Sequence, residues 1–195
     1  MQDRKKVVAS ISLVVFTGWI FFHWVGFGLE IDDPEFDQAL VWAETTGVKE
    51  TWLIQEYPFS PVTRAQAAVR YVLLAQDIWL VPDGDPNECV FADLEEFSAQ
   101  EKDMIVLACL FEFFKWTDGN FYPYNYVTKA NSLVALMRGL SPAREFPLEQ
   151  PYRTPYVTLA YQEWITKRES WPYLMYLITK YELLLQLHRV HERKK

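Results

Sequence analysis

Three stretches of the chain share one hydrophobic pattern, and each of them follows a threonine. Apolar or aromatic residues stand five, six and eight positions after Thr63, Thr128 and Thr179, which is the spacing of one face of an α-helix. A proline-containing stretch precedes each threonine, so the threonine stands where helices take their N-cap. The pattern therefore predicts three amphipathic helices, each beginning at one of these threonines.

The residues around the three threonines also recur. Gln66 and Glu182 stand three positions after their threonines, where a side chain can return a hydrogen bond to the cap backbone; the middle copy has the shorter Asn131 there. A basic residue directly follows each threonine: Arg64, Lys129 and Lys180. The same cap, cation and apolar stripe in three places indicate an internal repeat with connectors of uneven length.

The rest of the body also predicts helices. Residues 36–46 form the first helix and 63–80 the second, before a turn-rich link at 81–88. The capping box at Ser98 and Glu101 starts a helix through about Lys115, and this helix is apolar nearly all round, which predicts a place at the centre of the fold. After a proline-rich connector at 141–155, a further helix follows at 155–166. Sustained strand alternation is absent from the sequence, so the predicted fold class is all-α.

An uncharged apolar run covers residues 7–29, which is long enough to cross a bilayer as a helix. Basic residues 4–6 precede it and acidic residues follow it, so the predicted orientation is cytoplasmic N-terminus and extracytoplasmic body. Residues 1–30 are thus expected to be a basic tip and a single-pass transmembrane helix. The alternative is a signal peptide cleaved near Gly26 and Gly28, which would leave a secreted protein; the length of the run favours the anchor.

The threonine segments resemble a known family. An aromatic-x-Pro loop followed by Val or Ile, Thr and a basic residue at the start of a helix is similar to the S-layer homology (SLH) repeat, as is Phe91-Ala92-Asp93 ahead of the middle copy. The resemblance implies three helix–loop–helix repeats, at 31–80, 81–142 and 143–195, around a pseudo-threefold axis. It also implies a ligand, namely an acidic or pyruvylated wall polymer or the peptidoglycan, held in grooves between the repeats.

The cations beside the caps are the candidate ligands for that glycan. They stand in the first turn of a helix, where the helix dipole favours a bound anion, and as ligands they are expected to be exposed and unpaired. The full set of glycan-binding candidates is Arg64, Lys129, Lys180, Thr63, Thr128, Thr179, Tyr124 and Trp42. Arg64 is the strongest, because its planar fork matches a carboxylate. The alternative is that these are surface cations and core aromatics.

Charge and composition narrow the function further. The net charge of −7 and the lack of a basic stripe argue against a nucleic-acid partner. The sequence offers no nucleophile–base set and no metal cluster, so neither an enzyme nor a cofactor is expected. Asp83-x-Asp85 is interpreted as a plain turn, and His188 with His191 as a frayed surface pair. For the two cysteines, Cys89 and Cys109, the sequence leaves two alternatives, a disulfide or buried thiols.

These observations predict a membrane-tethered cell-envelope protein that binds cell-wall polysaccharide or peptidoglycan through SLH-like repeats. The alternative is a structural subunit of a membrane-associated assembly, whose SLH-like repeats pack on other envelope proteins and bind no glycan.

Overall fold

The computed structural model describes residues 33–47, 57–114, 118–141, 153–166 and 171–195, and within these segments the chain is helical. The α-helices are α1 (Pro34–Thr45), α2 (Arg64–Asp77), α3 (Ala99–Leu110), α4 (Lys129–Leu140), α5 (Arg153–Gln162), α6 (Trp171–Leu174) and α7 (Lys180–Lys194). A short 3-10 helix, η1, covers Pro86–Glu88. The only β-type pairs in this part of the chain are isolated bridges, so the all-α prediction is confirmed for it.

The three threonines begin helices, as predicted. The side-chain oxygens of Thr63, Thr128 and Thr179 accept the backbone N–H three residues on, at 3.3, 3.2 and 3.2 Å. At α2 and α7 the side chains of Gln66 and Glu182 return the bond to the cap N–H, which completes a capping box. The difference between the three caps therefore follows the sequence, because Asn131 is too short to close the box.

The residue before each of these threonines joins one closed ring of backbone hydrogen bonds. Val62 N–H donates to Ile178 O (3.1 Å), Ile178 N–H donates to Val127 O (2.9 Å), and Val127 N–H donates to Val62 O (2.9 Å). All three side chains are buried. Isolated bridges on either side of these residues join the same three segments. The loops that precede α2, α4 and α7 are thus fixed against one another, although long stretches of sequence separate them.

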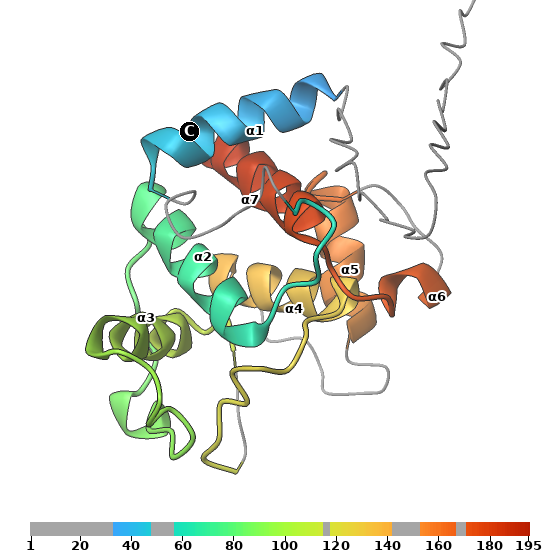
Figure 1. The fold of residues 1–195 in the computed structure, drawn as a ribbon. Helices are drawn as coiled ribbons and strands as arrows, with labels where there is room; N and C mark the ends of the chain where they lie inside the picture. The colour runs from blue at the N-terminus through green and yellow to red at the C-terminus, as the bar shows by residue number, and fades with distance from the viewer. Residues whose placement is uncertain (1–32, 48–56, 115–117, 142–152, 167–170) are drawn as a thin grey trace, which may run out of the picture. The chain divides into compact units, whose positions relative to one another are not determined.

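The helices pack in pairs across the boundaries of the predicted repeats. Helix α3 lies on α2, α5 lies on α4, and α1 lies on α7, as Figure 1 shows for the blue and red helices. Each pair unites the second helix of one predicted repeat with the first helix of the next. The pairing is cyclic, because the first helix in the chain covers the last one.

The three capped helices meet in a buried polar chain. Ser132 of α4 donates from its hydroxyl to Gln186 Oε1 of α7 (2.7 Å) and lies 2.8 Å from the Tyr71 hydroxyl of α2, so Tyr71 is left to donate to Ser132. All three residues are buried, and burial raises the pKa of the Tyr71 phenol above its ordinary value. Helix α4 occupies the interior, with ten of its 12 residues buried.

Two predictions about α3 are wrong. It ends at Leu110 instead of near Lys115, and it packs on α2 while α4 fills the centre. The chain leaves the helix at Glu112, which has a left-handed φ of 63°, and then buries Phe113 and Phe114 from a turn. The continuous apolar run in the sequence therefore serves two purposes: a half-buried helix and an aromatic turn. Phe113 lies so close to Gly139 of α4 that a Cβ there would be 2.3 Å from its ring.

The C-terminal helix does not fray at His191, contrary to the prediction. Helix α7 continues to Lys194, and His188 and His191 are buried instead of forming a surface pair. Helix α1 covers this face of α7, and His191 Nδ1 pairs with the Asp77 carboxylate at the end of α2. Trp42 of α1 donates from Nε1 to the same carboxylate (3.2 Å). The prediction of a frayed surface pair is wrong because α1 packs over these two histidines.

A disulfide joins Cys89, in the segment after η1, to Cys109 of α3, with 5.8 Å between the Cα atoms. It resolves the alternative that the sequence left open. The link from 81 to 98 is therefore tied to the helix that follows it.

The predicted basic tip and transmembrane helix, and most of the second connector, lie outside the described residues. In the segments that the structure does describe, no helix is both long and apolar enough to span a membrane.

Candidate functional site

The N-termini of α2, α4 and α7 are already occupied by protein. The first backbone N–H of each helix donates to a neighbouring loop: Arg64 to Asn125 O (2.8 Å), Lys129 to Tyr176 O (2.9 Å) and Lys180 to Ser60 O (3.0 Å). In α2 and α7 the second N–H does the same, from Ala65 to Pro123 O and from Tyr181 to Pro58 O. The backbone N–H groups that were expected to bind an anion donate to loop carbonyls instead. The N-termini of the three helices therefore help to fix the ring of loops.

Lys129 does not have the exposure expected of a glycan ligand. Its side chain is buried, its Nζ lies 2.5 Å from the Glu182 carboxylate, and the ammonium stands 4.6 Å from the centre of the Tyr173 ring. The expectation of an exposed, unpaired cation is wrong at this position. The reason is tertiary, because Glu182 belongs to the capping box of α7 and reaches Lys129 from the next repeat.

Arg64 has different neighbours. Its guanidinium lies 4.8 Å from the ring centre of Phe114 and 5.1 Å from that of Phe121, in cation–π geometry. Burial lowers the pKa of Arg64, and the Asp93 carboxylate partly offsets that effect. The third cation, Lys180, is half-buried at the start of α7. Arg64 thus packs against Phe121 and supports the loop that carries this residue.

Trp42 lies apart from the other candidates. It is buried between α1 and α7, with ring centres 5.8 Å from His188 and 5.2 Å from His191. It borders a cavity of about 530 Å³ with Asp77, and its indole N–H is taken up by that carboxylate. Trp42 therefore packs the α1–α7 joint.

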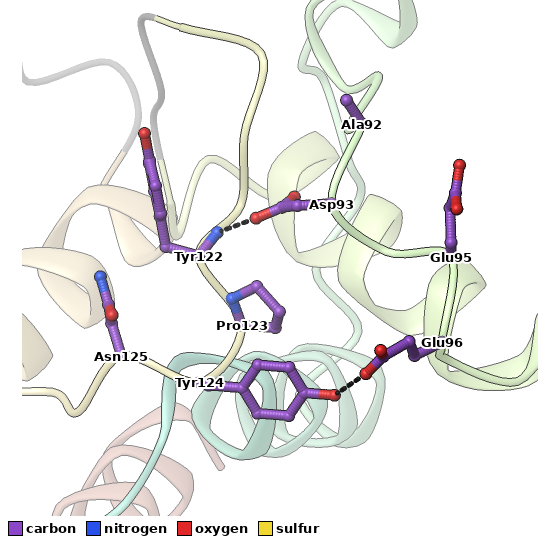
Figure 2. Close-up of a pocket in the computed structure, with 8 residues that line it drawn as sticks. All are labelled: Ala92, Asp93, Glu95, Glu96, Tyr122, Pro123, Tyr124 and Asn125. Carbon is purple, nitrogen blue, oxygen red and sulfur yellow. Dashed lines mark hydrogen bonds between the residues drawn. The ribbon is translucent and has the colours of Figure 1, made fainter.

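Tyr124 lies in a cleft of about 410 Å³ between the segment before α3 and the loop before α4 (Figure 2). The cleft is lined by Ala92, Asp93, Glu95, Glu96, Tyr122, Pro123, Tyr124 and Asn125. Every one of these residues comes from the second predicted repeat. The cleft therefore contains a predicted site residue, Tyr124, whose side chain is exposed.

Asp93 positions the far wall of the cleft. Its two carboxylate oxygens accept the backbone N–H groups of Phe121 (2.7 Å) and Tyr122 (2.6 Å), as Figure 2 shows for Tyr122. Tyr122 has a left-handed φ of 56°, which non-glycine residues seldom adopt, and these two charge-assisted bonds help to hold it there. The aspartate of the Phe-x-Asp motif therefore fixes the shape of the aromatic loop.

The two cleft tyrosines offer both ring faces and hydroxyls. Tyr124 is 63% and Tyr122 is 46% exposed. The Tyr124 hydroxyl donates to Glu96 (3.1 Å), and that bond raises the pKa of Tyr124. The Tyr122 hydroxyl donates to Asp118, which raises the pKa of Tyr122 and lowers that of Asp118. Both phenols are therefore protonated donors at neutral pH.

The chemistry of the cleft suits an uncharged, hydroxyl-rich ligand. The exposed residues Glu95, Glu96 and Asn125 line the cleft with groups that can accept or donate hydrogen bonds, and Glu96 already accepts one from the Tyr124 hydroxyl. The carboxylates of Glu95 and Glu96 repel an anionic ligand in this cleft. An acidic polymer is thus a poorer fit here than neutral sugar rings.

Of the eight candidates, the structure brings the three threonines together at the ring of loops, while Tyr124, Lys129 and Trp42 lie in separate places. Sequence reasoning missed Glu95 and Glu96. Their only signal was an acidic pair one residue beyond Phe-x-Asp, and nothing in the sequence put Glu96 within hydrogen-bond reach of Tyr124. The pairing of Asp77 with His191 was missed for the same reason.

Neither a family model nor a curated protein matches the chain. Among the residues that the structure describes, no cluster of three or more His, Cys, Asp or Glu is arranged to hold a metal ion.

Proposed function

We propose that this protein is a membrane-tethered cell-envelope protein that binds cell-wall glycan through three SLH-like repeats. The uncharged run at 7–29 would supply the tether, and the helical body would supply the binding. The repeats would stand around a pseudo-threefold axis. Support for that arrangement comes from the closed hydrogen-bond ring of Val62, Val127 and Ile178, in which each segment donates to one partner and accepts from the other.

The cyclic helix pairs support the same arrangement. A chain of three repeats that each contact only the next would leave the first and last helices uncovered. Here α1 packs on α7, so the first repeat closes onto the third as the second closes onto the first. The resemblance of the threonine segments to SLH repeats gives this closure a family context.

The observation that carries the glycan proposal is the cleft of Tyr122 and Tyr124. Two exposed tyrosines and an amide, from a loop whose backbone is held by Asp93, line this cleft together with two exposed carboxylates. A sugar ring would lie on a tyrosine face, and its hydroxyls would donate to Glu95 or Glu96. Because the carboxylates disfavour anions, the ligand would be the uncharged sugar rings of the wall glycan and not a pyruvylated group.

The test is co-sedimentation of the full chain with purified cell walls. Tyr124→Ala removes a ring that is 63% exposed in the cleft, and its matched control Tyr57→Ala removes a ring that is 57% exposed outside the cleft. Tyr124→Ala is expected to weaken wall binding by about tenfold, equivalent to about 1.4 kcal/mol, while Tyr57→Ala leaves it unchanged. Circular dichroism checks that both variants keep their helices.

Glu96→Gln sharpens this test, because it keeps the size of the side chain and removes the charge. It should weaken binding of neutral glycan less than Tyr124→Ala does, and added salt should have little effect because the contact is not ionic. Wild-type binding by Tyr124→Ala, or equal losses in Tyr124→Ala and Tyr57→Ala, would rule out the cleft as the glycan site.

A second candidate function is a structural subunit whose SLH-like repeats pack on protein. It is favoured by the helix N-termini, whose donors already hold loop carbonyls, and by the pairing of Lys129 with Glu182. A full chain that fails to sediment with walls, yet co-purifies with other envelope proteins, would select this function over glycan binding.

A further inference from the structure

The three loops of the hydrogen-bond ring carry no charged residue. Residues 57–63, 119–128 and 171–179 are free of Asp, Glu, Lys and Arg, in a chain of which 23% is charged. Their exposed large side chains outside the cleft form what we call the apolar rim: Tyr57, Phe59, Tyr126, Tyr173, Met175, Tyr176 and Leu177. Each is between 42% and 62% exposed. Such a gathering of apolar side chains on a surface marks an interaction site.

The rim is a rigid feature of one end of the molecule. The loops are fixed by the ring of Val62, Val127 and Ile178 and by the bonds from the helix N-termini to Ser60, Asn125 and Tyr176. The Tyr173 and Tyr176 rings pack edge to face at 5.4 Å. Because α2, α4 and α7 all begin at the ring, the loops before them lie at the same end of these helices.

The chain enters the described body beside this rim. Asp33, directly before α1, accepts a hydrogen bond from the Tyr181 hydroxyl. Tyr181 in turn donates from its backbone to Pro58 O (2.8 Å) and lies 5.9 Å, centre to centre, from the rim residue Phe59. The uncharged run that ends at Leu29 is only four positions before Asp33. Four residues span at most about 14 Å, which limits the length of chain between that run and Asp33.

We propose that the apolar rim lies in the headgroup region of the bilayer that holds the run at 7–29. This inference rests on the membrane tether of the proposed function and not on its glycan cleft. Tyrosine is typical of membrane interfaces, because its ring is apolar and its hydroxyl reaches water, and four of the seven rim residues are tyrosines. The body would then sit directly on the membrane instead of hanging from a linker.

The chemistry distinguishes the rim from the cleft and from a basic lipid-binding surface. The cleft tyrosines have carboxylates beside them, whereas the loop segments of the rim supply none. The charges at the chain entry are of both signs, with Glu35 paired to Arg189 and Lys129 paired to Glu182, so they give no net attraction to anionic lipid. The rim should therefore seat on zwitterionic lipid by apolar burial, without help from negative headgroups.

The experiment places an environment-sensitive fluorophore at Met175 in the rim and, as control, at Val81, which is 83% exposed in the link after α2. The chain has two cysteines, and both are in the disulfide, so Met175→Cys or Val81→Cys provides a single thiol in the oxidised protein. The labelled full chain is reconstituted in phosphatidylcholine vesicles, with and without lipids that carry a nitroxide near the headgroup.

The Met175 label is expected to shift to the blue and to lose intensity with nitroxide lipid, while the Val81 label stays as in water. Tyr176→Glu, which puts a carboxylate into the rim, should abolish the quenching at Met175 while the chain still floats with the vesicles. Equal exposure of both labels to water in a floating chain overturns the proposal. So does a chain that does not float, or a Met175 label that is shielded without lipid as protein concentration rises, which would indicate a second copy on the rim.

Wall binding is measured separately, so the two proposals can fail independently. If the wild-type chain does not bind walls but the Met175 label is still quenched by nitroxide lipid, the glycan-binding proposal is wrong and the membrane contact of the rim stands.

Discussion

Arg64 and Lys129 occupy the same place in two copies of one sequence pattern, and the structure gives them different partners. Each follows a threonine cap and begins a helix, and each donates its backbone N–H to the next loop. Both cations lie over aromatic rings, Arg64 over Phe114 and Phe121 and Lys129 over Tyr173, but Lys129 is also buried against the Glu182 carboxylate. A repeat in sequence therefore fixes the backbone role of a position and leaves its side-chain chemistry to its neighbours.

The third copy departs further. Ala65 and Ala130 stand two positions after their caps, but α7 has Tyr181 there, and its hydroxyl bonds to Asp33 ahead of α1. Tyr181 thus adds a side-chain hydrogen bond to the chain entry that an alanine at the same place cannot make. The three caps are thus one device adapted to three different neighbours.

The largest effect on the free energy of unfolding is expected from the replacement of Lys129. Lys129→Met leaves the Glu182 carboxylate, which is 30% exposed, without its cation, and should lower the free energy of unfolding by about 2 kcal/mol. The matched variant Lys180→Met removes a half-buried lysine from the same place in α7 and should cost less than about 1 kcal/mol. Denaturant unfolding measures both.

Adding Glu182→Gln to Lys129→Met should recover part of the loss, because glutamine keeps the capping box without a buried charge. If Lys129→Met and Lys180→Met lower the free energy of unfolding equally, the pairing of Lys129 with Glu182 does not stabilise the fold more than the contacts of Lys180 do. The proposed difference between these two positions would then be wrong.

A smaller effect is expected from the caps. Thr128→Ala removes the acceptor for the Asn131 N–H and should cost about 1 kcal/mol. Asn131→Gln should act in the other direction, by a few tenths of a kcal/mol, because the longer amide can close the capping box that α2 and α7 already have. Thermal unfolding of both variants is the measurement. A loss of stability in Asn131→Gln would show that the middle cap is shaped by packing and not by reach.

The pH dependence of stability that Tyr181 contributes is confined to alkaline pH. Burial, helped by the bond to Asp33, raises the pKa of Tyr181 from 10.0 to about 12. A raised pKa means that the folded protein holds the proton more tightly than the unfolded chain, so this contribution to stability is full below pH 10 and is lost as the pH rises through 12. Tyr181→Phe should flatten the stability curve over that range relative to wild type.

Free energies of unfolding at several pH values between 9 and 12 compare wild type with Tyr181→Phe, and the other tyrosines cancel in the difference. Parallel curves would place the shifted titration elsewhere.

Local chemistry made much of the fold predictable from the sequence. The starts of α2, α4 and α7 were readable because a threonine cap and its partner three residues on act within one turn of helix. The start of α3 at Ser98 followed from the same signal, and the all-α class followed from apolar spacing. Tyr124 was found as a site candidate because its loop is rich in aromatic residues.

Only the tertiary structure decided what lies opposite these elements. The burial of His188 and His191 and the pairing of Lys129 with Glu182 depend on helices from another predicted repeat, and α3 ends where the chain turns to bury Phe113 and Phe114. The contact of Glu96 with Tyr124 and the disulfide between Cys89 and Cys109 lie within the second predicted repeat, but they join residues 28 and 20 positions apart in the sequence. The physical reason is range: capping and helical periodicity act over three or four residues, whereas burial and ion pairing depend on segments that only the closed ring of loops brings together.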